Sequence, residues 1–212
     1  MFNKIFKNEN KLSILVVIIV LVIVVFIVFL LLFNNNEFIL NASDSLKIKE
    51  EYEKLNNTKS DDGKVYPIVN LPENNKLVYT DINEIINIFN SNMDAVVFIG
   101  NSSCIYCRSA IQVLCDTLVN TDIDKAYYLD IDKEKKGYDE LINVLEDNFL
   151  TDEDNIYIPL VLFIVNGNIV TSNKGTLFSQ YDPYEKLDDS QIEGLSEIYR
   201  YGIYDVLEGM ND

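Results

Sequence analysis

Two cysteines, Cys104 and Cys107, stand in the pattern Cys-Ile-Tyr-Cys directly after the apolar run AVVFIG at 95–100. A continuous apolar run of this length is expected for a central strand, and the Asn-Ser-Ser at 101–103 offers helix-capping side chains. The free N–H groups and dipole at a helix N-terminus stabilise a thiolate, which lowers the pKa of Cys104 below its usual value of about 8.5. Arg108 follows at once and can add a positive charge near the sulfurs, but the sequence does not fix the direction of its side chain. The pattern therefore predicts thiol–disulfide exchange, in which Cys104 attacks and Cys107 resolves the mixed disulfide.

Two other interpretations of the cysteine pair stay open. A tetrahedral zinc site needs four ligands, and three cysteines without any histidine would need a carboxylate to complete it. A structural disulfide in an exported domain needs only the pair itself. We expect no metal and no cofactor beyond the dithiol, because the eight glycines are too scattered to form a phosphate-binding loop.

The third cysteine, Cys115, lies eleven residues after Cys104. On one helix this spacing separates the two residues by about 16 Å, whereas a disulfide needs Cα atoms within about 7 Å. Cys115 is therefore predicted to pack in the core as a small apolar residue, with an exposed thiol that pairs between chains as the alternative.

The composition excludes several functions. The 212 residues contain no histidine, so Ser-His and Cys-His catalysis and imidazole metal ligands are absent. The 34 acidic side chains outnumber the 17 basic ones, which gives a net charge of −17. We therefore expect no nucleic-acid partner, because phosphates require a basic surface.

The uncharged apolar run at 12–33 predicts a transmembrane helix. Its 22 residues would form a helix about 33 Å long, enough for a hydrocarbon layer of about 30 Å, whereas the apolar part of a cleaved signal peptide has only about 7–15 residues. Lys4, Lys7 and Lys11 precede the run, so residues 1–11 form a cytoplasmic tail and the rest of the chain is extracytoplasmic. Residues 34–64 are interpreted as a tether with a spacer or docking helix at 46–55, followed by a domain over 65–212.

Strand and helix patterns alternate from residue 77 onward. Strands are predicted at 77–79, 95–100, 126–131, 160–165 and 169–171, and helices at 82–89, 104–118, 138–149 and 192–206. Asn166-Gly167 predicts a tight hairpin turn, and Asp188 with Gln191 predicts a capping box before the last helix. This order predicts an α/β fold with a central mixed sheet and helices on both faces.

The chain resembles the thioredoxin superfamily over about 77–207. The resemblance is carried by Cys104–Cys107 after a buried strand, by Ile158-Pro159 before LVLFIV, and by Asn166-Gly167 followed eight residues later by Gly175. It implies a thioredoxin-like fold in 65–212, with Cys104 and Cys107 as catalytic residues. It also implies that Pro159 is cis and lies against Cys104, and that the main chain of Ile158 pairs with a substrate strand. Tyr106, between the cysteines, is the third residue assigned to substrate binding.

More narrowly, the segments KIKEEYEKLN, CIYCRSAIQVL, AYYLDID and GTLFSQYDPYEKL are similar to membrane-anchored thioredoxin-like proteins of Gram-positive bacteria, the bacteriocin transport accessory type. The chain departs from thioredoxins at three positions. Ser103 replaces a tryptophan, Phe98 replaces a buried acid and Gln112 replaces a proline. Loss of the acid removes the expected proton acceptor for Cys107.

The sequence thus predicts a membrane-anchored, extracytoplasmic thiol–disulfide oxidoreductase. Its expected partners are exported proteins with thiols or disulfides and a second protein that recycles the cysteine pair. Residues 133–155, longer than the minimal family connection, are interpreted as a lid or specificity insert. The alternative is a non-catalytic accessory module for a transporter, in which Cys104–Cys107 is a structural disulfide.

Overall fold

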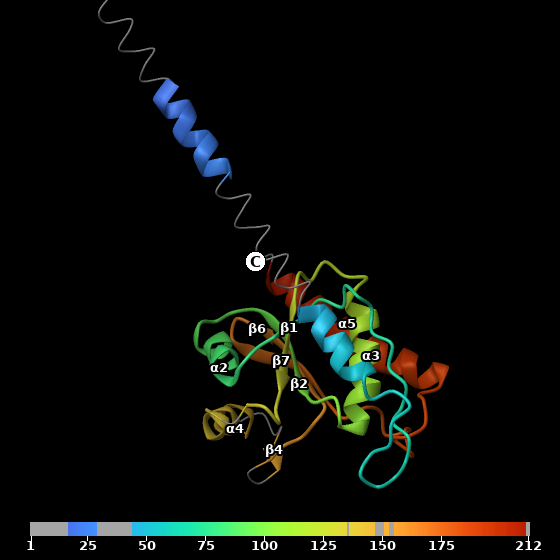
Figure 1. Ribbon diagram of the computed structural model, residues 1–212. Coiled ribbons are helices and arrows are strands. Elements are labelled where there is room, and N and C mark those ends of the chain that lie inside the picture. Colours follow the sequence, from blue (N-terminus) through green and yellow to red (C-terminus); the bar gives the residue numbers. More distant parts are fainter. Residues whose placement is uncertain (1–16, 29–43, 135, 147–150, 153–154, 211–212) are drawn as a thin grey trace, which may run out of the picture. The chain divides into compact units, whose positions relative to one another are not determined.

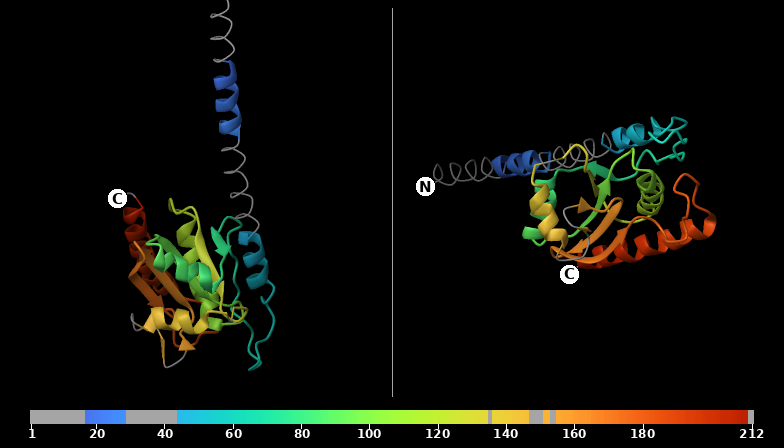
Figure 2. Two further views of the ribbon diagram at one scale, coloured as in Figure 1. Left: turned by 90° about the vertical axis from the view of Figure 1, so that its left-hand side faces the viewer. Right: turned by 90° about the horizontal axis from the view of Figure 1, so that it is seen from below.

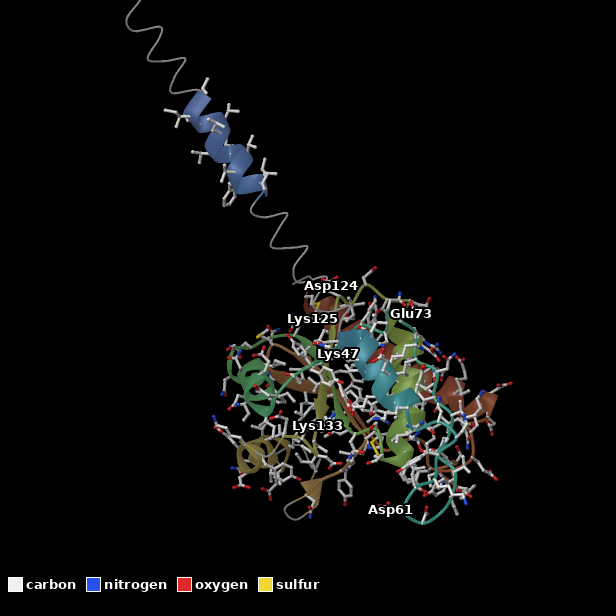
Figure 3. All side chains as sticks on the ribbon, viewed as in Figure 1. Lys47, Asp61, Glu73, Asp124, Lys125 and Lys133 are labelled. Carbon is white, nitrogen blue, oxygen red and sulfur yellow. A yellow bond between two sulfur atoms is a disulfide. The ribbon has the colours of Figure 1, made fainter. Side chains whose placement is uncertain are left out.

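The computed structural model describes residues 17–28, 44–134, 136–146, 151–152 and 155–210, and the chain divides into the compact units Met1–Leu40 and Asn41–Asp212. In the first unit, residues 17–28 form a helix whose apolar side chains are all exposed (Figure 3). None of the helices in the described ranges combines the length and the apolar character that crossing a membrane requires. Residues 12–16 and 29–33 of the predicted span lie outside the described residues.

The second unit is built on a five-stranded mixed sheet (Figure 1). The strands are β1 (Leu77–Tyr79), β2 (Ala95–Gly100), β3 (Ala126–Asp130), β6 (Leu160–Val165) and β7 (Asn168–Lys174), in the order β1-β3-β2-β6-β7. β1, β3 and β2 run parallel, and β6 is antiparallel to both β2 and β7. The predicted α/β class and mixed sheet are confirmed.

Helices cover both faces of this sheet, as predicted (Figures 1 and 2). α2 (Ile82–Asn90) and α4 (Tyr138–Glu146) pack on one face, and α3 (Ile105–Leu118), α5 (Asp189–Gly209) and a helix at 44–53 pack on the other. Each face has its own apolar cluster, because neighbouring strand residues point to opposite sides. Phe98 of β2 therefore joins the α3 cluster, whereas Val97 and Ile99 join the α2 cluster.

The helix at 44–53 belongs to this core. Its Ile48 and Tyr52 have no exposed surface and pack in the α3 cluster. The charged pattern at 46–55 predicts a spacer or docking helix before a domain that starts at residue 65. In the structure the segment is docked, and the compact unit already includes it.

The connection from β3 to β6 contains an element that the sequence patterns did not predict. β4 (Thr151–Asp152) and β5 (Asn155–Ile156) form a small antiparallel pair after α4. The main-chain N–H of Ile156 donates to the hydroxyl of Tyr138 on α4 at 3.2 Å, which anchors the pair. Each strand has only two residues, too few for an alternating pattern to be recognised.

Two local predictions are confirmed. Asn166 and Gly167 both have positive φ, 50° and 70°, as a two-residue turn between β6 and β7 requires. Asp188 caps α5: its carboxylate accepts the N–H of Gln191 at 2.8 Å, and the side chain of Gln191 accepts the N–H of Asp188 at 2.9 Å.

Candidate functional site

The loop between β2 and α3 fixes the position of Cys104. Asn101, the first residue after β2, accepts hydrogen bonds at its side-chain oxygen from the N–H of Cys104 at 2.7 Å and from the hydroxyl of Ser103 at 2.9 Å. Cys104 is the N-cap residue of α3, with extended φ and ψ of −73° and 118°. The sulfur therefore lies where the helix presents its unpaired N–H groups.

Cys104 and Cys107 form a disulfide at the N-terminal end of α3, with a Cα–Cα distance of 5.1 Å (Figure 3). Cys104 Sγ also accepts the main-chain N–H of Cys107 at 3.1 Å, in the manner of a capping side chain. Cys104 is half-buried, whereas Cys107 has no exposed surface. Cys104 is therefore the more accessible cysteine of the pair.

The sulfur of Cys107 lies in an apolar environment formed by the end of β2. A Cβ atom placed on Gly100 would come within 2.9 Å of Cys107 Sγ and within 2.8 Å of the ring of Phe98. Glycine is therefore required at position 100 because the sulfur and the ring fill the space of a side chain. At position 98, where thioredoxins carry a buried acid, the phenyl ring of Phe98 lies on the side of Gly100 that Cys107 Sγ also occupies.

The residues assigned to substrate binding lie at the start of β6 and between the cysteines. The Ile158–Pro159 bond is cis, as the resemblance implies. Ile99 of β2 pairs with Leu160, so the register places Pro159 beside Gly100, at the edge of the sheet where α3 begins. The Pro159 carbonyl accepts the N–H of Gly175 at 2.8 Å.

The main chain of Ile158 forms no hydrogen bond to another described residue, and its side chain is half-buried. Tyr106 is 38% exposed at the first turn of α3. The structure thus brings Cys104, Cys107 and Pro159 to one edge of the sheet, with Ile158 next to them.

Arg108 is a residue whose role the sequence did not reveal beyond its charge. Its side chain has no exposed surface, and its guanidinium donates four hydrogen bonds, to the carbonyls of Pro67 (2.9 Å), Tyr52 (2.9 Å) and Ser102 (3.1 Å) and to the side-chain oxygen of Asn56 (2.7 Å). Burial lowers the pKa of Arg108 from its ordinary value. Arg108 therefore connects α3 to the loop before Cys104 and to residues 52–67.

The rest of α3 is an uninterrupted helix. At the position of the family proline, the amide of Gln112 instead exchanges two hydrogen bonds with the main chain of Asn70, at 2.7 and 3.1 Å. Cys115 is unpaired and fully buried, and burial raises the pKa of its thiol well above the usual value. The prediction of a core cysteine is confirmed.

The described residues contain no group of three acidic or cysteine side chains arranged to hold a metal ion. Neither a protein-family model nor a curated protein matches the chain. The chemistry of the site therefore follows from its own residues, above all from the disulfide at the start of α3.

Proposed function

We propose that the chain is a membrane-anchored, extracytoplasmic thiol–disulfide oxidoreductase with a thioredoxin-like fold, which exchanges disulfides with exported proteins. The observation that carries this proposal is the disulfide at the N-terminus of α3, between one half-buried and one fully buried cysteine. A helix N-terminus stabilises the thiolate that forms when such a bond opens.

The two sulfurs have different roles in the exchange. A substrate thiolate attacks Cys104 Sγ, the Cys104–Cys107 bond breaks, and its electron pair stays on Cys107, which takes a proton. A second substrate thiolate then attacks the mixed disulfide and releases Cys104 as a thiolate. The reverse sequence reduces a substrate disulfide. A second protein recycles the pair.

Substrate binding next to Cys104 is supported by the start of β6. The main-chain groups of Ile158, unpaired within the described chain, are available to an extended substrate segment that adds as a strand. Pro159 lies beside them, and the exposed part of Tyr106 offers an aromatic surface between the cysteines.

Membrane attachment is supported by the apolar run at 12–33 and by the helix at 17–28, whose apolar side chains are exposed. Lysines before the run and acids after it favour a cytoplasmic N-terminus. The cysteine pair then works outside the reducing cytosol, where its disulfide persists.

Alkylation of the reduced full-length protein tests this proposal. The chain is reduced with dithiothreitol, treated with iodoacetamide at a series of pH values, and digested for mass spectrometry. We expect Cys104 to react first, with an apparent pKa well below about 8.5, and Cys115 to stay unmodified until the chain unfolds. A pair that excess dithiothreitol does not open would instead indicate a structural disulfide in an accessory module.

A further inference from the structure

Arg108 carries a buried positive charge that is in contact with no carboxylate of the described residues. All four of its hydrogen-bond acceptors are neutral, and the ring of Tyr66 lies below the guanidinium with its centroid 5.3 Å from Cζ. Across the described ranges, none of the ion pairs includes Arg108. Neutral oxygens satisfy the N–H groups, but they leave the full charge in a medium that screens it poorly.

This charge is in contact with the loop that leads into the cysteine pair. The guanidinium contacts the carbonyl of Ser102, two residues before Cys104, and the side chain belongs to the residue after Cys107. It therefore adds to the positive potential of the helix N-terminus at which Cys104 Sγ already accepts an N–H. Both contributions favour a negative sulfur.

The buried carboxylate that the sheet places near the pair is itself paired. Asp130 is the register partner of Gly100 on β3 and is 5% exposed. Its carboxylate lies 2.6 Å from Lys133 Nζ, which also contacts Glu51 at 3.0 Å. Partial burial lowers the pKa of Lys133, but hydrogen bonds to Asp130 and Glu51 outweigh this effect and raise the pKa above its ordinary value, so the lysine stays charged. Within the described ranges, Arg108 is therefore a buried charge without a carboxylate in contact, whereas Asp130 is held by the lysine that it shares with Glu51.

We propose that the uncompensated charge of Arg108 stabilises the thiolate of Cys104 and with it the reduced pair, so that the oxidised protein donates its disulfide to dithiols of exported chains. This inference rests on the proposed function and specifies the direction of its redox reaction, which is oxidation of the substrate dithiol. A thiol that is more stable as a thiolate leaves a disulfide more readily, which makes the disulfide a stronger oxidant.

The reaction balances for one turnover. The substrate dithiol loses two electrons and two protons and forms its disulfide. The Cys104–Cys107 bond breaks and takes up the two electrons, Cys104 leaves as the thiolate, and Cys107 takes up one of the two protons. The second proton passes to solvent.

Asn56 offers a way to neutralise the charge without removing Arg108. Its side-chain oxygen lies 2.7 Å from Arg108 Nη2 and also accepts the N–H of Val69 at 2.9 Å, while its NH2 group donates to the carbonyl of Val69 at 2.7 Å. Asn56→Asp places a carboxylate against the guanidinium and turns a carboxylate oxygen, in place of the NH2 group, toward the carbonyl of Val69. Asn56→Ala removes all three hydrogen bonds without adding charge, so it controls for the loss of these bonds.

The experiment equilibrates the full-length oxidised chain with mixtures of reduced and oxidised glutathione and measures the reduced fraction by alkylation. We expect Asn56→Asp to shift the equilibrium about tenfold toward the disulfide, which corresponds to about 30 mV, and to raise the pKa of Cys104. Arg108→Met is expected to shift it in the same direction, whereas Asn56→Ala and Arg108→Lys stay close to the wild type. Circular dichroism checks that each variant is folded.

Two results separate the failure of this inference from the failure of the proposed function. If the wild type forms a mixed disulfide with glutathione on Cys104 but folded Asn56→Asp and Arg108→Met leave the equilibrium and the pKa unchanged, the role of Arg108 is refuted and the exchange activity stands. If Cys104 forms no mixed disulfide in any variant, the proposed function fails and the inference fails with it.

Discussion

The sulfur of Cys107 and the ring of Phe98 lie against the same side of Gly100. The ring of Phe98 contacts Tyr128 with centroids 6.0 Å apart, and Tyr128 contacts Tyr52 of the helix at 44–53 at the same distance. Cys107 therefore lies beside the first of three aromatic side chains, Phe98, Tyr128 and Tyr52, which follow one another on the α3 face of the sheet. Residues far apart in the sequence fix the place of the buried sulfur.

Gly100→Ala is expected to destabilise the fold. Its methyl group would stand 2.9 Å from Cys107 Sγ and 2.8 Å from the Phe98 ring, neither of which has free space to move into. Overpacking of this kind costs about 1–3 kcal/mol in the free energy of unfolding, which urea denaturation measures.

Gly194→Ala is the control for that substitution. Gly194 lies within α5, and its added Cβ would meet only the end of the Leu177 side chain at 3.2 Å. Alanine favours a helix over glycine by up to about 1 kcal/mol, so this variant should equal or exceed the wild type in stability. Equal losses from both substitutions would contradict the close packing at Gly100.

Ile48→Ala tests whether the helix at 44–53 belongs to the cooperative fold. Ile48 has no exposed surface, so its truncation should lower the free energy of unfolding by about 2–5 kcal/mol. Leu46→Ala in the same helix, at a position that is 43% exposed, should change it by no more than about 0.5 kcal/mol. A spacer helix outside the core would instead give small changes for both variants.

Asp188→Asn is expected to lower the thermal midpoint at neutral pH and to have less effect in acid. Hydrogen bonds from the hydroxyl of Ser190 and then from the N–H of Gln191 lower the pKa of Asp188 from its usual range. A carboxyl with a lowered folded-state pKa stabilises the fold above its unfolded pKa, and this contribution is lost as the pH falls through the folded value. Thermal scans between pH 7 and about pH 3 should therefore show that the thermal midpoints of the wild type and the variant converge below about pH 4. A constant difference across this range would refute a charged cap.

The local features of the site were predictable because they depend on neighbouring residues. The apolar run at 95–100, the capping side chains that follow it and the cysteine spacing predicted a buried strand that leads into a helix with Cys104 at its start. Asn166-Gly167 predicted its turn because both residues tolerate positive φ.

The surroundings of the site were not predictable, because they come from distant segments. Arginine side chains are usually exposed, so the sequence predicts an exposed charge at position 108. No residue near Arg108 in the sequence indicates that it is buried against the carbonyls of Pro67 and Tyr52, which lie 41 and 56 positions away. The charged pattern of 46–55 likewise gave no sign that Ile48 and Tyr52 fill the α3 face, since few apolar residues interrupt it.

Trapping of exported proteins on Cys104 is the most direct measurement of the central claim. In Cys107→Ser the resolving sulfur is absent, so mixed disulfides formed by Cys104 persist until a reductant is added. Non-reducing electrophoresis and mass spectrometry of the full-length variant are expected to show exported proteins joined to Cys104, and none in the matched Cys104→Ser, Cys107→Ser double variant. If Cys107→Ser traps no more protein than the double variant does, the cysteine pair is not an exchange site and the account is wrong.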